Sequence, residues 1–132
     1  MMKSDTFRFF SAAMLVLLVS QGANAGDVIV ISNPGITISA DEVKDIYLGE
    51  KQFAGSTRLV PVDNAAVQSD FLSKFMQMNA AKYNGAWNKK TFRDGLAPPA
   101  VKSSDAEVIE YVKRTPGAVG YVRGPGGVNV VK

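Results

Sequence analysis

Strand-like runs alternate with helix-like segments along the chain, and this alternation constrains the fold more than any other feature of the sequence. Residues 27–32 contain an unbroken β-branched run, which is typical of a strand buried on both faces. Helix signals follow over residues 39–49, a second strand-like run over residues 58–63, and further helix signals from residue 65 and over residues 104–114. The pattern predicts an α/β domain with a small, mostly parallel sheet covered by helices.

Two of the expected helices carry specific end signals. Ser39 with Glu42, and Ser104 with Glu107, have the Ser-x-x-Glu spacing of a capping box. In this motif each side chain accepts a hydrogen bond from the backbone N–H of the other residue. Gly49 suits the position just after a helix, where a left-handed backbone conformation ends it. We therefore predict helices that begin after the two serines.

A further helix is predicted from residue 65, because four large apolar residues recur at helical spacing: Val67, Phe71, Phe75 and Met78. Asp63 or Asn64 would cap this helix. Residues 80–90 either extend it or begin a second helix, and Tyr83 and Trp87, four residues apart, are expected in the core rather than stacked on a ligand. The side chains predicted to pack from helices against the sheet are Phe71, Phe75, Ile109 and Val112.

Prolines and a glycine mark two of the remaining positions. Pro61 has no N–H to donate, so its strand is expected at a sheet edge or to be irregular there. Pro116 stops the last helix, and Gly117 allows a positive φ, which predicts a helix-to-strand connection at this point. Residues 118–122 and 128–131 are then predicted as two short strands.

The N-terminal segment has the features of a signal peptide rather than of the folded domain. Two cations precede an apolar run over residues 9–19, and an Ala-Asn-Ala sequence follows, ending at Ala25. The apolar run is too short for a membrane-spanning helix, which needs about 20 residues. We predict a signal peptide at residues 1–25, cleavage after Ala25, and a periplasmic domain at residues 26–132.

The residue types that are missing exclude most enzymes. The chain has no His and no Cys, which excludes thiol nucleophiles, histidine bases and the usual zinc ligand sets. No metal-ligand spacing occurs, and we predict neither a metal nor a cofactor. The formal net charge is +3, and no basic run is interleaved with aromatic residues, which argues against nucleic acid as a partner. A non-enzymatic protein is predicted.

Three segments together resemble the phosphate-type ABC transporter substrate-binding proteins: ADEVKDIYLGEKQ, LVPVD and EVIEYVKRTPGAVGYV. The resemblance covers residues 27–132 and is closest to short, single-lobe members. It implies one lobe of a type II periplasmic-binding-protein-like fold, whose full-length relatives have two lobes that close on an oxyanion. Because a cleft needs two walls, a lone lobe implies a partner protein, a homodimer or an open surface site.

The resemblance also implies a ligand site. In the family, the helix after the segment matching LVPVD opens with Ser, Gly and Thr beside an Arg, and these groups hold phosphate. Ala65, Ala66 and Val67 stand there in this chain, so backbone N–H groups are the donors that remain, and any affinity is expected to be weak. Ligands of open α/β sheets gather at the carboxyl ends of strands, so further residues are expected to take part: Ser32, Asn33, Asp63, Asn64 and Arg93. Their structural alternatives are a turn, a helix cap and a surface arginine.

Two functions remain open at this point. The first is an exported solute-binding-like protein that binds phosphate or another oxyanion weakly for an ABC-type uptake system. The second is an interaction module, a former binding lobe that docks a membrane transporter, porin or sensor without holding a small ligand. The scaffold favours the first, and the missing family side chains favour the second.

Overall fold

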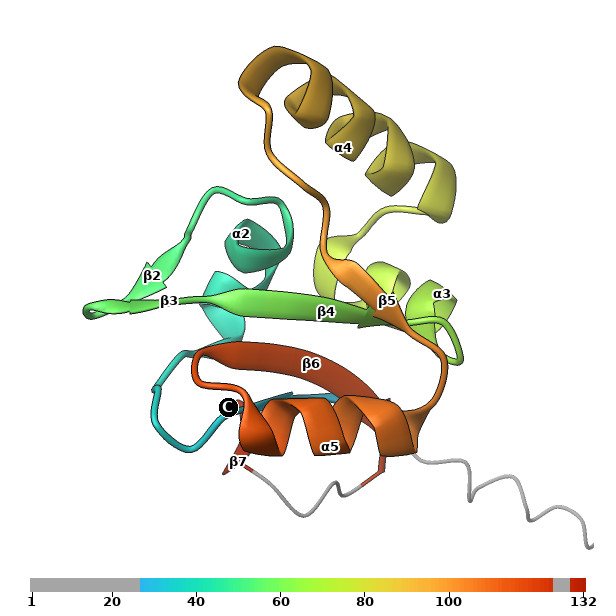
Figure 1. The fold of residues 1–132 in the computed structure, drawn as a ribbon. Helices are drawn as coiled ribbons and strands as arrows, with labels where there is room; N and C mark the ends of the chain where they lie inside the picture. Colours follow the sequence, from blue (N-terminus) through green and yellow to red (C-terminus); the bar gives the residue numbers. More distant parts are fainter. Residues whose placement is uncertain (1–26, 125–128) are drawn as a thin grey trace, which may run out of the picture.

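The computed structural model describes residues 27–124 and 129–132. Its strands are β1 Val28–Ser32, β2 Phe53–Ala54, β3 Thr57–Arg58, β4 Val60–Asn64, β5 Ala100–Lys102, β6 Ala118–Arg123 and β7 Asn129–Val130. Its helices are η1 Ala40–Glu42, α2 Val43–Tyr47, α3 Gln68–Phe71, η2 Leu72–Met76, α4 Ala80–Asp94 and α5 Asp105–Arg114. Five strands form one sheet in the order β5-β4-β6-β1-β7. Helix α5 covers one face of it, and α2, α3 and α4 lie on the other (Figure 1).

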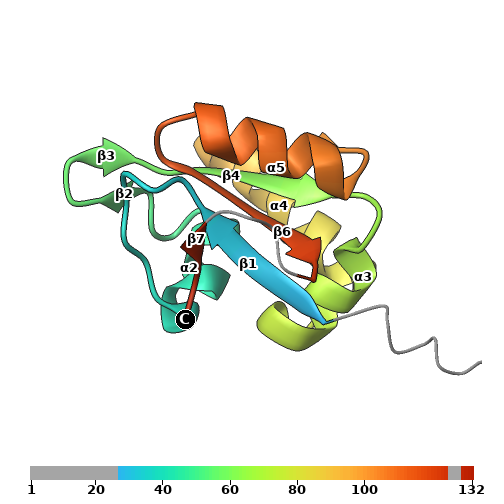
Figure 2. The ribbon, with the colours of Figure 1, turned by 90° about the horizontal axis from the view of Figure 1, so that it is seen from below.

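Strand β1 runs opposite to the other strands of the sheet. β4 pairs in parallel with β5 and β6, whereas β1 pairs antiparallel with both β6 and β7. Four of the five strands therefore point the same way, and β1, which lies beside β6 in Figure 2, is the reversed one. The predicted α/β domain with a small, mostly parallel sheet covered by helices is confirmed.

Alternate residues of the two central strands face opposite sides of the sheet. Val30 and Tyr121 belong to a core shared with α2, α3 and α4, whereas Ile31 and Val122 belong to a second core beneath α5. All four are at most 1% exposed. This explains the unbroken β-branched run of β1, because a strand with apolar neighbours on both faces has no place for polar alternation.

Both predicted capping boxes lie at the start of a helix, but only the first is complete. Ser39 and Glu42 exchange both bonds, and the N–H of Ser39 donates to Oε1 of Glu42 over 2.8 Å. Oγ of Ser104 accepts from the N–H of Glu107 over 3.2 Å, whereas Oε1 of Glu107 accepts from the N–H of Ser103 over 2.8 Å instead of from that of Ser104. The first segment opens with the single turn η1 before it continues as α2. Gly49 then has a φ of 76°, the left-handed conformation predicted for this helix end.

The helix predicted from residue 65 is less regular than its apolar stripe indicates. α3 is one turn long and continues as the π-helical η2, after which Gln77 ends it with a φ of 51°. A π-helical turn adds a residue, so Met76, five residues after Phe71, takes the buried position that Phe75 would hold in a regular α-helix. Met76 is fully buried, whereas Phe75 is half-buried and packs at the margin of the core.

Residues 80–94 form the separate helix α4, which decides between the two predicted alternatives for this segment. Oδ1 of Asn79 accepts from the N–H of Lys82 over 2.9 Å and caps the helix. Tyr83 and Trp87 are both buried, so the prediction that they are core residues is confirmed.

Strand β4 lies between β5 and β6, yet Pro61 has a strand neighbour on one side only. β5 pairs with β4 from Val62 onward, whereas Pro61 pairs with Val119 of β6. The start of β4 is therefore not covered by β5. A residue without an N–H is tolerated there because no ladder bond is expected on the uncovered side.

Some predictions fall on residues that the structure does not describe. The signal peptide at residues 1–25 lies outside the described residues, and so does Val128 of the last predicted strand. Within residues 27–124 and 129–132, no helix combines the length and the apolar character needed to cross a membrane.

Candidate functional site: an apolar groove with a cationic end

The strand ends that were predicted to meet lie at opposite ends of the sheet. Ser32 and Asn33 follow β1, and residues 63–64 end β4. β1 is antiparallel to β6 while β4 is parallel to it, so Ser32 lies opposite Val119, the residue that also pairs with Pro61 at the start of β4. The predicted convergence of these residues is therefore wrong, because the carboxyl-end rule applies to strands that run in the same direction.

Asn33 makes the hydrogen bonds of a structural turn. Its Nδ2 donates to the carbonyl oxygen of Val112 over 3.0 Å, and its Oδ1 accepts from the N–H of Gly35 over 2.9 Å. These bonds tie the turn after β1 to the last turn of α5. Ser32, which is 3% exposed, lies beneath this turn. Ligand contacts by either residue stay a prediction, and the turn is the alternative that the geometry supports.

The backbone N–H groups predicted to hold an anion are bonded within the protein. The N–H of Ala65 donates to the carbonyl oxygen of Lys102 over 2.9 Å. Asn64 accepts the next two: its Oδ1 from Ala66 over 3.0 Å, and its carbonyl oxygen from Val67 over 3.1 Å. An anion here would have to displace bonds that already satisfy these donors. Anion binding at this turn stays a prediction with no spare donor to support it.

Asp63 is a buried carboxylate held by two tyrosines. It is 1% exposed, and it accepts from the hydroxyl groups of Tyr121 over 2.7 Å and Tyr83 over 2.8 Å. Burial raises the pKa of Asp63 above the 3.8 of an exposed aspartate, and the two hydroxyl bonds oppose that rise. Burial, together with the charge of Asp63, raises the pKa of both tyrosines. The three side chains link β4, β6 and α4 inside the core, which differs from the predicted ligand and cap roles of Asp63.

We predict that Asp63 makes the free energy of unfolding fall as the pH rises. A carboxyl whose folded pKa lies above its unfolded value binds its proton more tightly in the folded state. Its stabilising contribution is therefore complete below about pH 4 and is lost as the pH rises through the folded pKa. Urea denaturation of Asp63→Asn across this range should give a stability curve without this fall. The exposed Asp41→Asn variant is the control, and parallel curves for all three proteins would contradict the prediction.

Arg93 lies far from the other predicted site residues. It stands near the end of α4, ten residues or about 15 Å beyond Tyr83 along the helix. Its guanidinium pairs with the carboxylate of Asp94, with an N–O distance of 3.0 Å and 66% of the arginine side chain exposed. The structure thus places Arg93 on the surface, and a role in binding an oxyanion together with strands β1 and β4 stays a prediction without geometric support.

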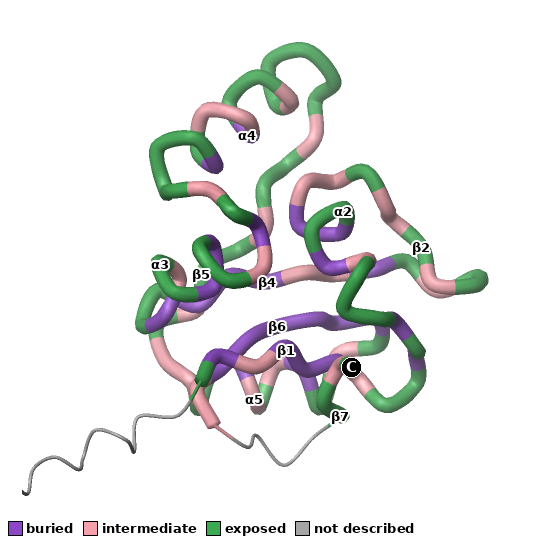
Figure 3. The backbone as a smooth tube through the Cα atoms, turned by 180° about the vertical axis from the view of Figure 1, so that it is seen from behind, coloured by how far each residue is buried: buried purple, intermediate pink, exposed green. Residues whose placement is uncertain are grey.

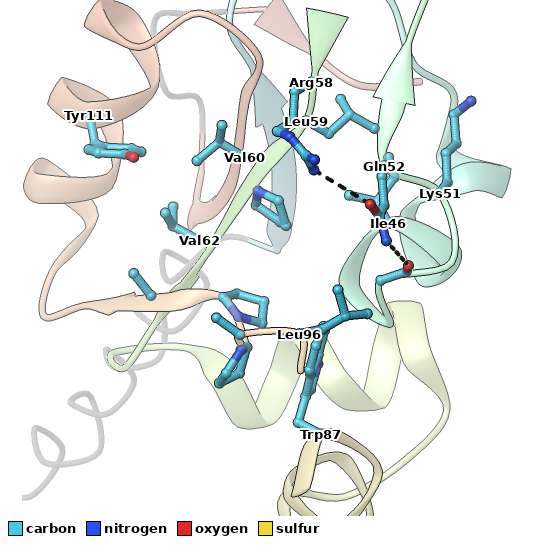
Figure 4. A pocket seen from close by; sticks show the side chains of 16 residues that line it. Ile46, Lys51, Gln52, Arg58, Leu59, Val60, Val62, Trp87, Leu96 and Tyr111 are labelled. Atoms are coloured by element: carbon cyan, nitrogen blue, oxygen red, sulfur yellow. Dashed lines mark hydrogen bonds between the residues drawn. The ribbon is translucent and has the colours of Figure 1, made fainter. Parts of the chain in front are cut away.

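A groove of about 380 Å³ opens beside the uncovered start of β4. Its walls come from α2 and the loop after it, from β4, and from residues 96–100, which cross in front of the strand (Figure 4). Apolar side chains make most of the lining, including Ile46, Val60, Pro61, Trp87, Leu96 and Pro98. This is the size and the composition of a small-molecule site in proteins.

One end of the groove is cationic. Arg58 and Lys51 both line it, with Gln52 between them (Figure 4). Lys51 pairs with Glu42 over 3.4 Å, whereas Arg58 has no carboxylate within ion-pair distance among the described residues. The Arg58 guanidinium lies 5.1 Å from the centre of the Phe53 ring and donates over 3.5 Å to Oε1 of Gln52. Its N–H groups are thus only weakly engaged and are available to donate to an anionic group.

The floor of the groove is held rigidly by Trp87. Its Nε1 donates to the carbonyl oxygen of Tyr47 over 2.9 Å, so the polar atom of the indole is satisfied within the protein and the ring presents apolar surface. A Cβ at Gly49 would lie 2.8 Å from the ring, which shows how closely the loop after α2 packs on it. The floor is therefore formed before any ligand binds.

The groove was not predicted from the sequence. No helix or strand was predicted over residues 91–102, although α4 extends to Asp94 and Ala100–Lys102 form β5, and Arg58 was predicted only as the start of a strand. Pro98 and Pro99 indicated an irregular backbone there, but not that it would cross in front of β4. The one signal that pointed to the groove was Pro61, because a residue without an N–H marks a strand edge that no other strand covers.

Comparisons with known proteins support the fold alone. No protein-family model and no curated protein sequence matches the chain. PstS from Borrelia burgdorferi matches with a TM-score of 0.51 and 20% identity over 80% of this chain. An ABC-type phosphate transport receptor from Vibrio cholerae matches with a TM-score of 0.48 and 11% identity, also over 80%. The chain spans about half of each, 46% and 45% of their lengths. The match to PstS from Borrelia burgdorferi supports the predicted fold, which corresponds to about half of that protein.

Proposed function

We propose that the protein is an exported, non-enzymatic solute-binding protein that holds a small organic anion in the groove. The observation that carries the proposal is Arg58, an arginine with no carboxylate partner among the described residues, at one end of an apolar groove. A ligand with an apolar body and an oxyanion head fits both features at once. The receptor-like fold supports a binding role and an ABC-type uptake system as its setting.

Inorganic phosphate fits the groove less well than an organic anion. A bare phosphate would meet Arg58 but would leave the apolar lining around Pro61 and Trp87 in contact with water. An aromatic or alkyl carboxylate would bury that lining, which is favourable by about 25 cal/mol per Å² of apolar surface. Because the groove is open to solvent on one side, we expect a Kd on the order of 0.1–1 mM. A homodimer or a partner protein would cover that open side.

We expect mass spectrometry of the exported protein to show an N-terminus at Gly26.

We expect this exported protein to bind benzoate. In amide NMR titrations the shifts should cluster at residues 46–62, 87 and 96–100. Benzyl alcohol, which has the same ring but no charge, should bind more weakly, and Arg58→Gln should weaken benzoate about three- to tenfold by removing a charged donor. Arg93→Gln makes the same change of charge outside the groove and should leave benzoate binding unaltered.

The same titrations can overturn the proposal. Equal binding of benzoate by the wild type and Arg58→Gln would show that the cationic end of the groove does not hold the carboxylate. Inorganic phosphate that shifts residues 32–33, 63–68 and 93–95 more strongly than benzoate shifts the groove would favour the oxyanion site predicted from the sequence. No shift with any of these compounds would favour the second function.

The second candidate function is an interaction module that docks another protein. The observation that favours it is the outer face of α4, where Phe92 is 94% exposed. A face of this kind has no role in holding a small ligand in the groove. Docking to a membrane transporter, porin or sensor would leave both the groove and the strand ends free.

A further inference from the structure

Helix α4 uses one face for the core and leaves the other face unpacked. Tyr83 and Trp87 are the buried residues of this helix. The helix stands off the sheet in Figure 1, and its outer side is coloured as exposed in Figure 3. Phe92 is nine residues beyond Tyr83, and nine steps of about 100° bring it half a turn away from the buried face. Its ring, 94% exposed, therefore points away from the core of its own domain.

Gly85 lies on this outer face, and the described structure has no need of a glycine there. It is seven residues before Phe92, two turns back on the same side of the helix. Its φ is not positive, and a Cβ added at this position would meet nothing within 4 Å. Glycine weakens a helix interior relative to alanine. A glycine that costs helix stability and relieves no contact inside the domain allows the backbone of another chain to approach closely.

The outer face is also positively charged. Lys82, Lys89 and Arg93 are spaced by seven and four residues, so they lie on one side of α4, flanking Gly85 and Phe92. The two lysines are exposed and make no ion pair among the described residues. The cation of Arg93 is shared with Asp94. Charge of this sign complements an acidic partner and disfavours a second copy of the same face.

We propose that the outer face of α4, defined by Lys82, Gly85, Lys89, Phe92 and Arg93, docks an acidic amphipathic helix of another protein. The partner helix crosses at Gly85, inserts an apolar stripe beside the Phe92 ring, and places its carboxylates against the flanking cations. This inference rests on the second of the proposed functions and names the chemistry of the partner. It does not involve the groove, which lies on the other side of Trp87.

The test uses a synthetic 18-residue helical peptide with a leucine stripe flanked by glutamates, titrated into the exported protein. Amide shifts should fall on residues 81–93, with a Kd on the order of 10–100 μM that weakens as salt screens the charges. The same peptide with lysine in place of glutamate should bind at least tenfold more weakly. Phe92→Ala should weaken the acidic peptide at least fivefold. Lys89→Glu should weaken it more than Lys113→Glu, which makes the same change of charge on α5.

Gly85→Ala separates docking from stability. It should raise the melting temperature of the free protein by about 2–5 °C, because alanine is the better helix former, while weakening the acidic peptide at least threefold. A purely structural role would move the melting temperature alone. Arg58→Gln should leave peptide binding unchanged, and Phe92→Ala should leave benzoate binding unchanged, so this inference and the ligand groove fail separately.

Three outcomes would overturn the inference. Equal binding of the acidic and basic peptides would show that charge does not select the partner. Absence of binding by the acidic peptide, or full binding by Phe92→Ala, would show that the outer face of α4 does not dock such a helix. Phe92-dependent binding to vesicles of one part phosphatidylglycerol to three parts phosphatidylcholine, tighter than to the acidic peptide, would assign the face to an anionic membrane surface instead.

Discussion

Gly117→Ala is expected to lower the free energy of unfolding by about 2–5 kcal/mol. Gly117 has a φ of 81°, which costs an L-residue about 1–2 kcal/mol. An added Cβ would lie 2.1 Å from the carbonyl oxygen of Arg58 and 3.2 Å from Cγ2 of Thr57. Because the nearest atom belongs to the backbone, β3 or β6 would have to shift, which adds the cost of overpacking, about 1–3 kcal/mol. Urea denaturation measures the loss.

Gly55→Ala is the matched control for this change. Gly55 also has a positive φ, 62°, but a Cβ there would meet nothing within 4 Å. It should therefore lose only the conformational part, about 1–2 kcal/mol. Equal losses at Gly55 and Gly117 would show that the close approach to Arg58 carries no cost. A larger loss at Gly117 would establish that the helix-to-strand connection after α5 is fixed by packing as well as by backbone conformation.

Phe71→Ala is expected to cost about 3–5 kcal/mol, a large part of the stability of a domain this size. The Phe71 ring is fully buried and lies parallel to Tyr121, with ring centres 3.8 Å apart, and its centre is 4.8 Å from that of Tyr47. Removing it would open a cavity between α3 and the sheet, next to the Asp63 cluster. Chemical denaturation should show the loss as a lower midpoint with little change of slope.

Phe75→Ala tests the π-helical turn against the regular helix that the sequence predicts. A regular α-helix would bury Phe75 beside Phe71 and make the two substitutions about equally costly. In the structure Phe75 is half-buried, because Met76 takes the inner position. Its truncation should therefore cost about 1–2 kcal/mol less than that of Phe71, in line with the smaller apolar area removed from the core. Equal losses would contradict the shifted register of η2.

Asp63 shows why the role of a predicted site residue could not be derived from the sequence. As the last but one residue of β4, it had the position of a ligand or a helix cap, and both assignments use only its neighbours in the chain. Its actual partners are the hydroxyl groups of Tyr83 and Tyr121, which are 20 and 58 residues away. A side chain that finds its hydrogen bonds in the core leaves no local trace in the sequence.

The sequence by itself determined the local events: the capping box at Ser39, the helix cap at Ser104, the left-handed Gly117, the burial of β1 on both faces, and the chemistry excluded by the absence of His and Cys. These depend on backbone conformation and on neighbours within a few residues. Only the tertiary structure decided the direction of β1, which pairs with β6 at the far end of the chain. Strand direction is set by long-range pairing rather than by local propensity. That one reversal separates Ser32 and Asn33 from the end of β4, while the short β5 leaves open the edge of β4 on which the groove is built.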